Sequence, residues 1–164
     1  MLFRSAEREV VDAIESTTGR PAMTTAGAIL GALQALRVKR LVMVSPYPQV
    51  INDDEKAFLE EAGVEVLTER AFNLPSKEWA TTPPAFWQTA VRDNAHADAD
   101  AYFMSCTNIQ SIHAIASVES VMGRPAITSN QAALWHALRL LGRSDVIPGL
   151  GRLLGLTLAP AVVT

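Results

Sequence analysis

The sequence predicts an α/β fold in which helices cover both faces of a parallel sheet, giving three layers. One observation is that short apolar runs, typical of buried strands, alternate along the chain with helical patterns. A second is that a helix–strand–helix pattern occurs twice in the same order of elements. Strands separated by helices are typical of a parallel sheet covered on both sides.

Helices are expected where apolar residues recur at helical spacing, and glycines mark several of their ends. The first carries Val10, Val11 and Ile14 on one face and stops at Gly19. The second is expected to start at Thr25, whose side chain can cap it. The predicted helices span residues 7–18, 25–36, 52–62, 84–96, 109–122 and 131–141.

Strands are expected where short apolar runs end in polar residues, prolines or glycines. The run from Lys39 to Ser45 is the clearest, and Pro46-Tyr47-Pro48 ends it. The predicted strands span residues 21–24, 39–45, 64–67, 101–105 and 125–128, with a long loop over 71–84.

The two copies of the helix–strand–helix pattern also have similar amino-acid sequences. Gly19 to Thr25 reads Gly-Arg-Pro-Ala-Met-Thr-Thr, and Gly123 to Ser129 reads Gly-Arg-Pro-Ala-Ile-Thr-Ser. We therefore expect two similar lobes with the site between them: the end of a first lobe over 6–37, a complete second lobe over 38–142 and a tail over 143–164. The repeat offset places the first-lobe counterpart of Cys106 at or before Leu2, so most of the first lobe is expected to be missing. The apolar stretch from Leu153 to Val163 is expected to be exposed.

Composition argues against several classes of function. The net charge is −3 and no basic run is present, which disfavours nucleic-acid binding. The longest charge-free stretch, Pro21 to Leu36, contains polar residues and is short for a membrane span. A single cysteine allows no internal disulfide, which suits a reducing, cytoplasmic compartment. The histidines lack metal-ligand spacing, so no metal is expected, and the acidic run Asp53-Asp54-Glu55 is interpreted as a solvated helix start.

That single cysteine, Cys106, stands where an apolar run ends in small polar residues and a helical pattern begins. In parallel α/β proteins, ligands bind at the carboxyl ends of strands, close to helix N-termini. A thiol at such a place is more readily converted to the nucleophilic thiolate. From position alone, a reactive thiol and an ordinary packing cysteine remain equal alternatives.

Longer motifs surround this cysteine. The stretch Ser105-Cys106-Thr107-Asn108 is followed by Gly123 to Gln131 and then by Leu134-Trp135-His136. These motifs resemble the aspartate/glutamate racemase superfamily, in its branch of maleate cis–trans isomerases and arylmalonate decarboxylases. The start of the second lobe in that branch is resembled by Ser45-Pro46-Tyr47, Ile51-Asn52 and the run from Phe58 to Val66.

The resemblance implies a site that works without metal or organic cofactor. Cys106 corresponds to the second-lobe cysteine, and Tyr47 to the tyrosine that hydrogen-bonds a substrate carboxylate. Asn73 corresponds to a carboxylate-binding asparagine, and Thr107 contributes its N–H and hydroxyl beside the thiol. Read without the resemblance, Tyr47 could equally be a packing residue at a turn, and Asn73 a plain loop residue.

The function expected from the resemblance is maleate isomerase-like chemistry on a small dicarboxylate, with Cys106 as catalytic thiol. The alternatives are an arylmalonate decarboxylase-like or amino-acid racemase-like enzyme, and an inactive fragment or small-acid binding module. The partners expected are a small carboxylate substrate and further copies of the chain, with neither nucleic acid nor membrane.

Overall fold

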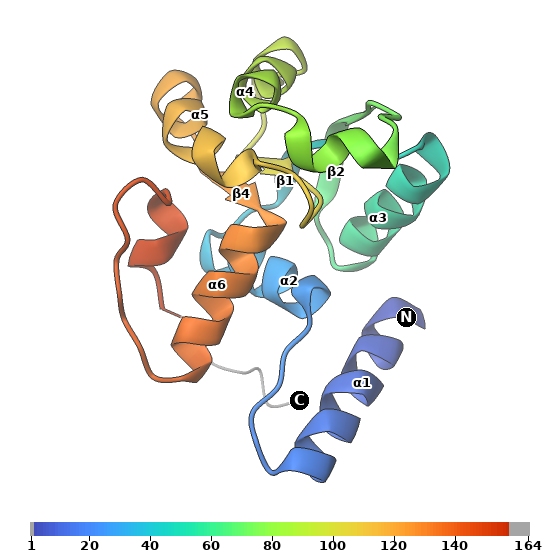
Figure 1. Cartoon of the computed structure of the whole chain (residues 1–164), viewed down its shortest axis with the longest axis vertical. Coiled ribbons are helices and arrows are strands. Elements are labelled where there is room, and N and C mark those ends of the chain that lie inside the picture. Colours follow the sequence, from blue (N-terminus) through green and yellow to red (C-terminus); the bar gives the residue numbers. More distant parts are fainter. Residues whose placement is uncertain (1, 158–164) are drawn as a thin grey trace.

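The computed structural model describes residues 2–157, with side chains from residue 5 onward. Four parallel strands form one sheet in the order β2-β1-β3-β4. Their bounds are β1 Arg40–Ser45, β2 Glu65–Ala71, β3 Ala101–Met104 and β4 Ala126–Thr128. The predicted parallel α/β fold is therefore confirmed (Figure 1).

The described residues also form six α-helices and three short 3₁₀ helices. The α-helices are α1 Leu2–Thr18, α2 Thr25–Ala35, α3 Gln49–Glu61, α4 Pro84–Asp93, α5 Ile115–Met122 and α6 Ser129–Leu140. The 3₁₀ helices are η1 Ser76–Thr81, η2 Ser111–Ala114 and η3 Arg152–Gly155. None of the helices in this part of the chain is both long and apolar enough to cross a membrane.

Alternate residues of the strands supply two separate cores, one on each face of the sheet. Leu41 and Met43 of β1 face the core formed with α2 and α6, where Trp135 is fully buried. Val42 and Val44 face the opposite core, which α4 and α5 cover. Figure 1 shows these two helical layers on opposite sides of the strands. Successive side chains of a strand point to opposite faces of the sheet, so a strand whose residues are all apolar contributes to the cores on both faces.

The strand predicted at residues 21–24 is absent, and that prediction is wrong. A strand needs a neighbour for its backbone hydrogen bonds, and the sheet of residues 2–157 offers none to this segment. Thr24 instead caps α2: its Oγ1 accepts a hydrogen bond from the Gly27 N–H at 2.9 Å. The cap is thus one residue earlier than the sequence suggested.

The sequence repeat is also a repeat of local structure. In each copy, a left-handed glycine follows the helix, and the helix's glutamate accepts a hydrogen bond from the N–H of an alanine further on. A threonine then caps the next helix in each copy. The equivalent residues are Gly19 and Gly123, Glu15 and Glu119, Ala22 and Ala126, and Thr24 and Thr128. The capped helices α2 and α6 pack against one another. The lobe boundaries at 37 and 142 remain a prediction.

The chain after α6 folds back onto that helix. The Trp135 Nε1–H donates to the Leu156 carbonyl at 2.9 Å, and the Arg139 guanidinium donates to the carbonyls of Leu156 and Leu154. Leu153 and Leu154 are fully buried, so the expected exposure of this stretch is wrong for them. These side chains complete the core beneath α6, and the rest of the expected tail, 158–163, lies outside the described residues.

Candidate active site

The carboxyl ends of the strands meet at one edge of the sheet, because all the strands are parallel. Val44 pairs with Met104, and Ser45 pairs with Ala71, so β1, β2 and β3 end nearly level. Tyr47 follows β1, Asn73 follows β2, and Cys106 and Thr107 follow β3. The predicted site residues therefore all lie along the same edge.

Cys106 is held tightly in an unusual backbone conformation. Its backbone φ angle is 111°, a value that residues with a side chain rarely adopt. Cys106 is also buried, with 3% of its surface exposed. The Cys106 N–H donates to the Ser129 hydroxyl at 3.2 Å, and the Asn108 N–H donates to the Cys106 sulfur at 3.3 Å. A strained backbone fixed by its surroundings is common at functional sites.

The helix beside Cys106 is not the one that the sequence indicated. A helix was expected over 109–122, directly after the thiol. Instead η2 intervenes, and α5 begins only at Ile115. The helix N-terminus near the thiol belongs to α6, whose first residue, Ser129, accepts the hydrogen bond from Cys106. The positive end of a helix thus lies near the thiol, but it follows β4 rather than β3.

Tyr47 links the thiol to the neighbouring strand. Its hydroxyl lies close to the side chains of Cys106 and Ser105. Burial, followed by the contact with Cys106, raises the pKa of Tyr47 well above its ordinary value, so the hydroxyl keeps its proton and can donate it in a hydrogen bond. The ring packs edge-on against Trp79 at 5.4 Å between centroids. Tyr47 therefore both packs and presents a polar group beside the thiol.

Glu55 is the site residue that sequence analysis missed. Its Oε1 accepts a hydrogen bond from the Ser105 hydroxyl at 2.5 Å, while Oε2 is buried and has no partner in the part of the chain that the structure describes. Burial raises the pKa of Glu55 to about 7, and the bond from Ser105 opposes that shift. The interpretation of this residue as part of a solvated helix start is therefore wrong.

A signal for Glu55 was nevertheless present in the sequence. Helix α3 begins at Gln49 rather than at 52, so Glu55 lies in its second turn. Asn52 and Leu59 are both fully buried, and Glu55 is three residues after one and four before the other. That spacing places all three on the inward face of the helix.

Asn73 and Thr107 are at the edge, but their side chains are exposed. The Asn73 N–H donates to the Tyr47 carbonyl at 3.0 Å, and its φ of 48° is one that asparagine tolerates better than most residues. The Thr107 carbonyl accepts from the Asn130 amide at 2.9 Å. Both residues shape the loops around the site through their backbones, and their ligand contacts remain predictions.

A pocket of about 320 Å³ opens beside this cluster, within the ~300–1,000 Å³ range of small-molecule sites. It lies between the start of α2 and the inward face of α3. Its lining residues are Ala26, Tyr47, Ile51, Asp54, Glu55 and Phe58. Among the described residues, no group of three or more His, Cys, Asp or Glu side chains is placed to hold a metal ion.

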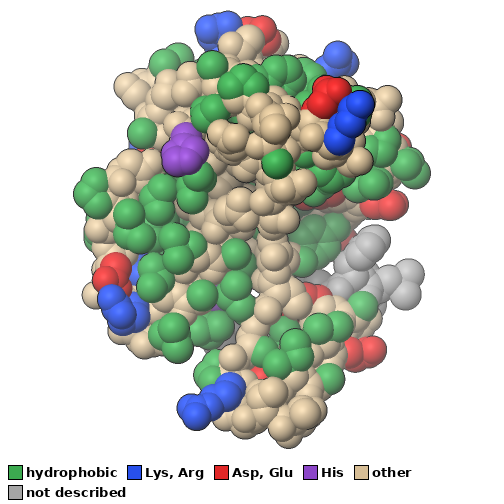
Figure 2. Space-filling view, viewed as in Figure 1, with side chains coloured by type: hydrophobic (Ala, Val, Ile, Leu, Met, Phe, Trp, Pro, Cys, Tyr) green, Lys and Arg blue, Asp and Glu red, His purple; other side chains and the backbone are tan. Residues whose placement is uncertain are grey.

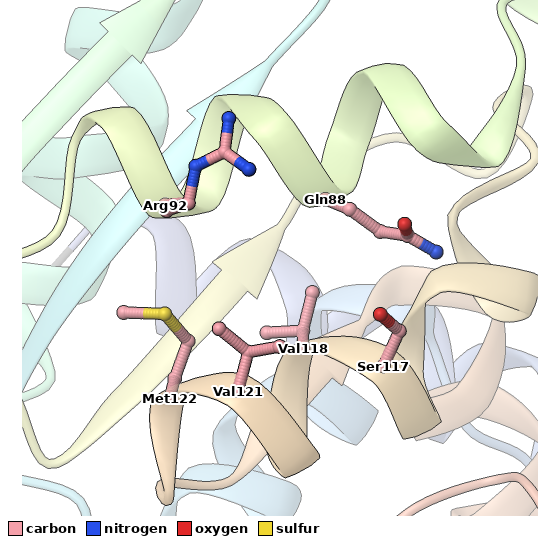
Figure 3. Close-up of a pocket in the computed structure, with 6 residues that line it drawn as sticks. All are labelled: Gln88, Arg92, Ser117, Val118, Val121 and Met122. Atoms are coloured by element: carbon pink, nitrogen blue, oxygen red, sulfur yellow. The ribbon is translucent and has the colours of Figure 1, made fainter.

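A smaller crevice of about 80 Å³ lies elsewhere, between α4 and α5. Its lining residues are Gln88 and Arg92 of α4 and Ser117, Val118, Val121 and Met122 of α5 (Figure 3). None of these residues follows a strand, and the crevice holds none of the site residues described above. The edge with Cys106 is therefore the better candidate for a functional site.

The fold and the site together define a class: an α/β unit with a strained, hydrogen-bonded cysteine at the carboxyl edge of a parallel sheet. A model of the arylmalonate decarboxylase family matches residues 2–154. The chain belongs to that family.

The relatives that the chain resembles include both maleate isomerases and an arylmalonate decarboxylase. Maleate isomerase from Pseudomonas putida is 32% identical over 136 residues, which are 82% of this chain and 54% of the relative. Arylmalonate decarboxylase from Bordetella bronchiseptica is 32% identical over 145 residues, which are 86% of this chain and 60% of the relative. The chain thus spans little more than half the length of these relatives, both of which are enzymes.

A solved structure extends the likeness to three dimensions. It is a mutant of the maleate cis-trans isomerase of Nocardia farcinica with a covalently bound succinylcysteine intermediate. The two folds superpose with a TM-score of 0.83 at 26% identity, over 90% of this chain and 63% of that one. In that relative, a cysteine therefore forms a covalent bond to a four-carbon dicarboxylate.

Proposed function

We propose that this chain carries a maleate isomerase-like site in which Cys106 attacks the double bond of a small unsaturated dicarboxylate. The observation that carries the proposal is the fixed thiol itself, with the Asn108 N–H on its sulfur and the Tyr47 hydroxyl beside it. The covalent succinylcysteine of the Nocardia farcinica relative supports the same chemistry.

The proposed reaction begins when the Cys106 thiolate forms a C–S bond to one alkene carbon. The π electrons move to the other carbon and its carboxylate, so the central bond becomes single and can rotate. Expulsion of the thiolate then restores the double bond in the trans arrangement. Tyr47 would hydrogen-bond a substrate carboxylate as charge builds there.

Turnover by this chain alone is expected to be slow. In the maleate isomerases that the chain resembles, a second thiol handles the proton, and this sequence contains one cysteine. Addition of Cys106 to the substrate is expected to be easier to detect than multiple turnovers.

The test therefore measures whether maleate forms a covalent adduct with Cys106. The purified chain is incubated with maleate, and intact-protein mass spectrometry measures any gain of one maleate, while proton NMR follows fumarate. We expect an adduct on Cys106 that is absent in Cys106→Ser and present in the surface variant Glu60→Gln. A chain whose Cys106 forms no adduct, or whose Cys106→Ser variant still makes fumarate, would contradict the proposal.

Arylmalonate decarboxylation is the second candidate, favoured by the family model that matches residues 2–154. There, loss of CO₂ leaves an enediolate, and the Cys106 thiol would donate the proton to its α-carbon. Incubation with phenylmalonate separates the two: phenylacetate formation that Cys106→Ser abolishes, without any maleate adduct, favours the decarboxylase.

We further propose a cytoplasmic location for the chain. A reducing compartment keeps a thiol such as Cys106 in the free form in which it is found here.

A further inference from the structure

One acidic group in the pocket has no part in the proposed thiol chemistry. Glu55 lines the pocket, its Oε1 accepts from Ser105, and its Oε2 is buried without a partner among the described residues. A buried polar atom without a hydrogen bond is uncommon and needs a physical reason.

An ionised Glu55 would repel an anionic ligand in this pocket, because of the groups that surround it. The titratable groups that line the pocket with it are Tyr47 from the β1–α3 turn and Asp54 on its own helix, and Cys106 lies beside Tyr47. Helix α2 contributes Ala26, and the carboxylate that α1 brings nearby, Glu7, accepts a hydrogen bond from Thr24 at 2.8 Å.

Among the described residues, no Lys, Arg or His lines this pocket. A ligand carboxylate and an ionised Glu55 would therefore repel each other, with no cation from the described lining between them.

We propose that Glu55 is protonated whenever a carboxylate ligand occupies this pocket, so that its O–H donates a hydrogen bond to the ligand beside the Tyr47 hydroxyl. The inference rests on the proposed function, because it takes a small dicarboxylate as the ligand. Ser105 already donates to Oε1, which leaves Oε2 as the oxygen that carries the proton. Where Glu55 is ionised in the free chain, each binding event would make it take up one proton from solvent.

The acidity of Glu55 makes this proton uptake feasible at neutral pH. Burial raises its pKa to about 7, so near neutral pH half of the chains already hold the proton before any ligand arrives. Above that pH, binding requires protonation, and the dissociation constant should rise about tenfold per pH unit. The pKa of Tyr47 is raised, so its hydroxyl does not titrate in this range.

The experiment uses succinate, which has no double bond, and the Cys106→Ala variant, which has no thiol to titrate or react. Isothermal titration calorimetry at about pH 8, in two buffers of different ionisation enthalpy, gives the number of protons bound per succinate. We expect close to one proton in Cys106→Ala. We expect none when Glu55→Gln is added, because the Gln amide donates at every pH; its affinity should then stay flat between about pH 6 and 9.

Two further variants separate this role from a structural one. Glu60→Gln, an exposed acid on the same helix, should leave proton uptake unchanged. Glu55→Ala, which removes the donor, should bind succinate more weakly than Glu55→Gln at every pH. If Cys106→Ala does not fold, carbon-13 NMR of the Glu55 carboxyl in the unmutated chain replaces calorimetry, and succinate should raise the pKa of Glu55.

Three results would overturn the inference: succinate affinity independent of pH, proton uptake that survives Glu55→Gln, and no succinate binding at all. Its failure is distinct from failure of the proposed function, which rests on adduct formation at Cys106. A reactive thiol without proton uptake contradicts only the inference about Glu55. Proton uptake in a chain with an inert thiol contradicts only the isomerase proposal.

Discussion

Ser105 and Glu55 are 50 positions apart in the chain, yet the Ser105 hydroxyl donates to the Glu55 carboxylate at 2.5 Å. The bond joins the end of β3 to the inward face of α3. It also fixes one oxygen of a carboxyl whose other oxygen is buried and unpartnered. This single contact is the reason that an acidic residue on a charged helix becomes part of the site.

The buried carboxyl makes stability depend on pH. Burial raises the pKa of Glu55 in the folded chain from 4.5 to about 7, so between those values the folded state holds a proton that the unfolded state has released. This contribution to stability is therefore lost as the pH rises from 4.5 to 7.

Glu55→Gln should remove that loss. The variant is expected to be about 2–3 kcal/mol more stable than the unmutated chain at about pH 8, and little different at about pH 4. Urea unfolding at the two pH values measures the difference, with Glu60→Gln as the matched control. Equal stabilities of Glu55→Gln and the unmutated chain at the higher pH would show that the carboxyl is better solvated than the structure indicates.

The backbone of Cys106 yields a second prediction. At a φ of 111°, any side chain is strained, and glycine alone adopts this conformation freely. Such strain costs on the order of 1–3 kcal/mol, partly offset in a glycine variant by about 0.5–1 kcal/mol of added freedom in the unfolded chain.

Cys106→Gly should therefore be more stable than Cys106→Ala by about 1 kcal/mol. Both variants lack the thiol, so the difference in their stability reports the effect of the backbone conformation at position 106. Guanidinium unfolding of the pair gives the difference. If the alanine variant were the more stable one, the strained loop would not be a feature of the folded chain.

Sequence reasoning succeeded where a residue's surroundings are set by local pattern. The run from Lys39 to Ser45, apolar from Leu41 to Val44, contains β1, and the polar residues after Met104 place Cys106 at the sheet edge. The prediction of a strand at 21–24 was wrong because a strand forms only beside another strand, and the sequence of the segment does not show whether one is present.

The site was harder to predict because its contacts join distant segments. Glu55 differs from its neighbours Asp53 and Asp54 only in the direction of its side chain, which the start of α3 at Gln49 determines. The bond from Cys106 to Ser129 likewise depends on the order of strands in the sheet, which places β4 next to β3.

Tyr47 provides a third prediction, on ligand binding. Tyr47→Phe keeps the ring that packs on Trp79 and removes only the hydroxyl beside Cys106. A hydrogen bond to a charged group is worth about 1.5–3 kcal/mol, so succinate should bind about 10- to 150-fold more weakly. Calorimetry measures the affinity, and Tyr102→Phe, on the face of β3 covered by α4 and α5, serves as the control. Unchanged affinity in Tyr47→Phe would reduce this residue to a packing role.

The last prediction concerns association of the chain with itself. Helix α1 presents Val10 and Ile14 at 50% and 43% exposure, and its position at the margin of the molecule leaves them uncovered (Figure 1). Further exposed apolar side chains lie on and just after α6, and Figure 2 shows hydrophobic groups scattered over this face with few charges among them.

Apolar surface of this kind favours self-association in water. We expect the purified chain to form dimers or larger species, measured by size-exclusion chromatography with light scattering. Placing charges on α1 with Val10→Lys and Ile14→Lys should shift the population toward monomer, because burying either ammonium group in an interface is costly. Asp12→Lys, at an exposed position between them, is the matched control and should leave the assembly state unchanged. A chain that stays monomeric at high concentration without these substitutions would rule out α1 as a contact surface between copies.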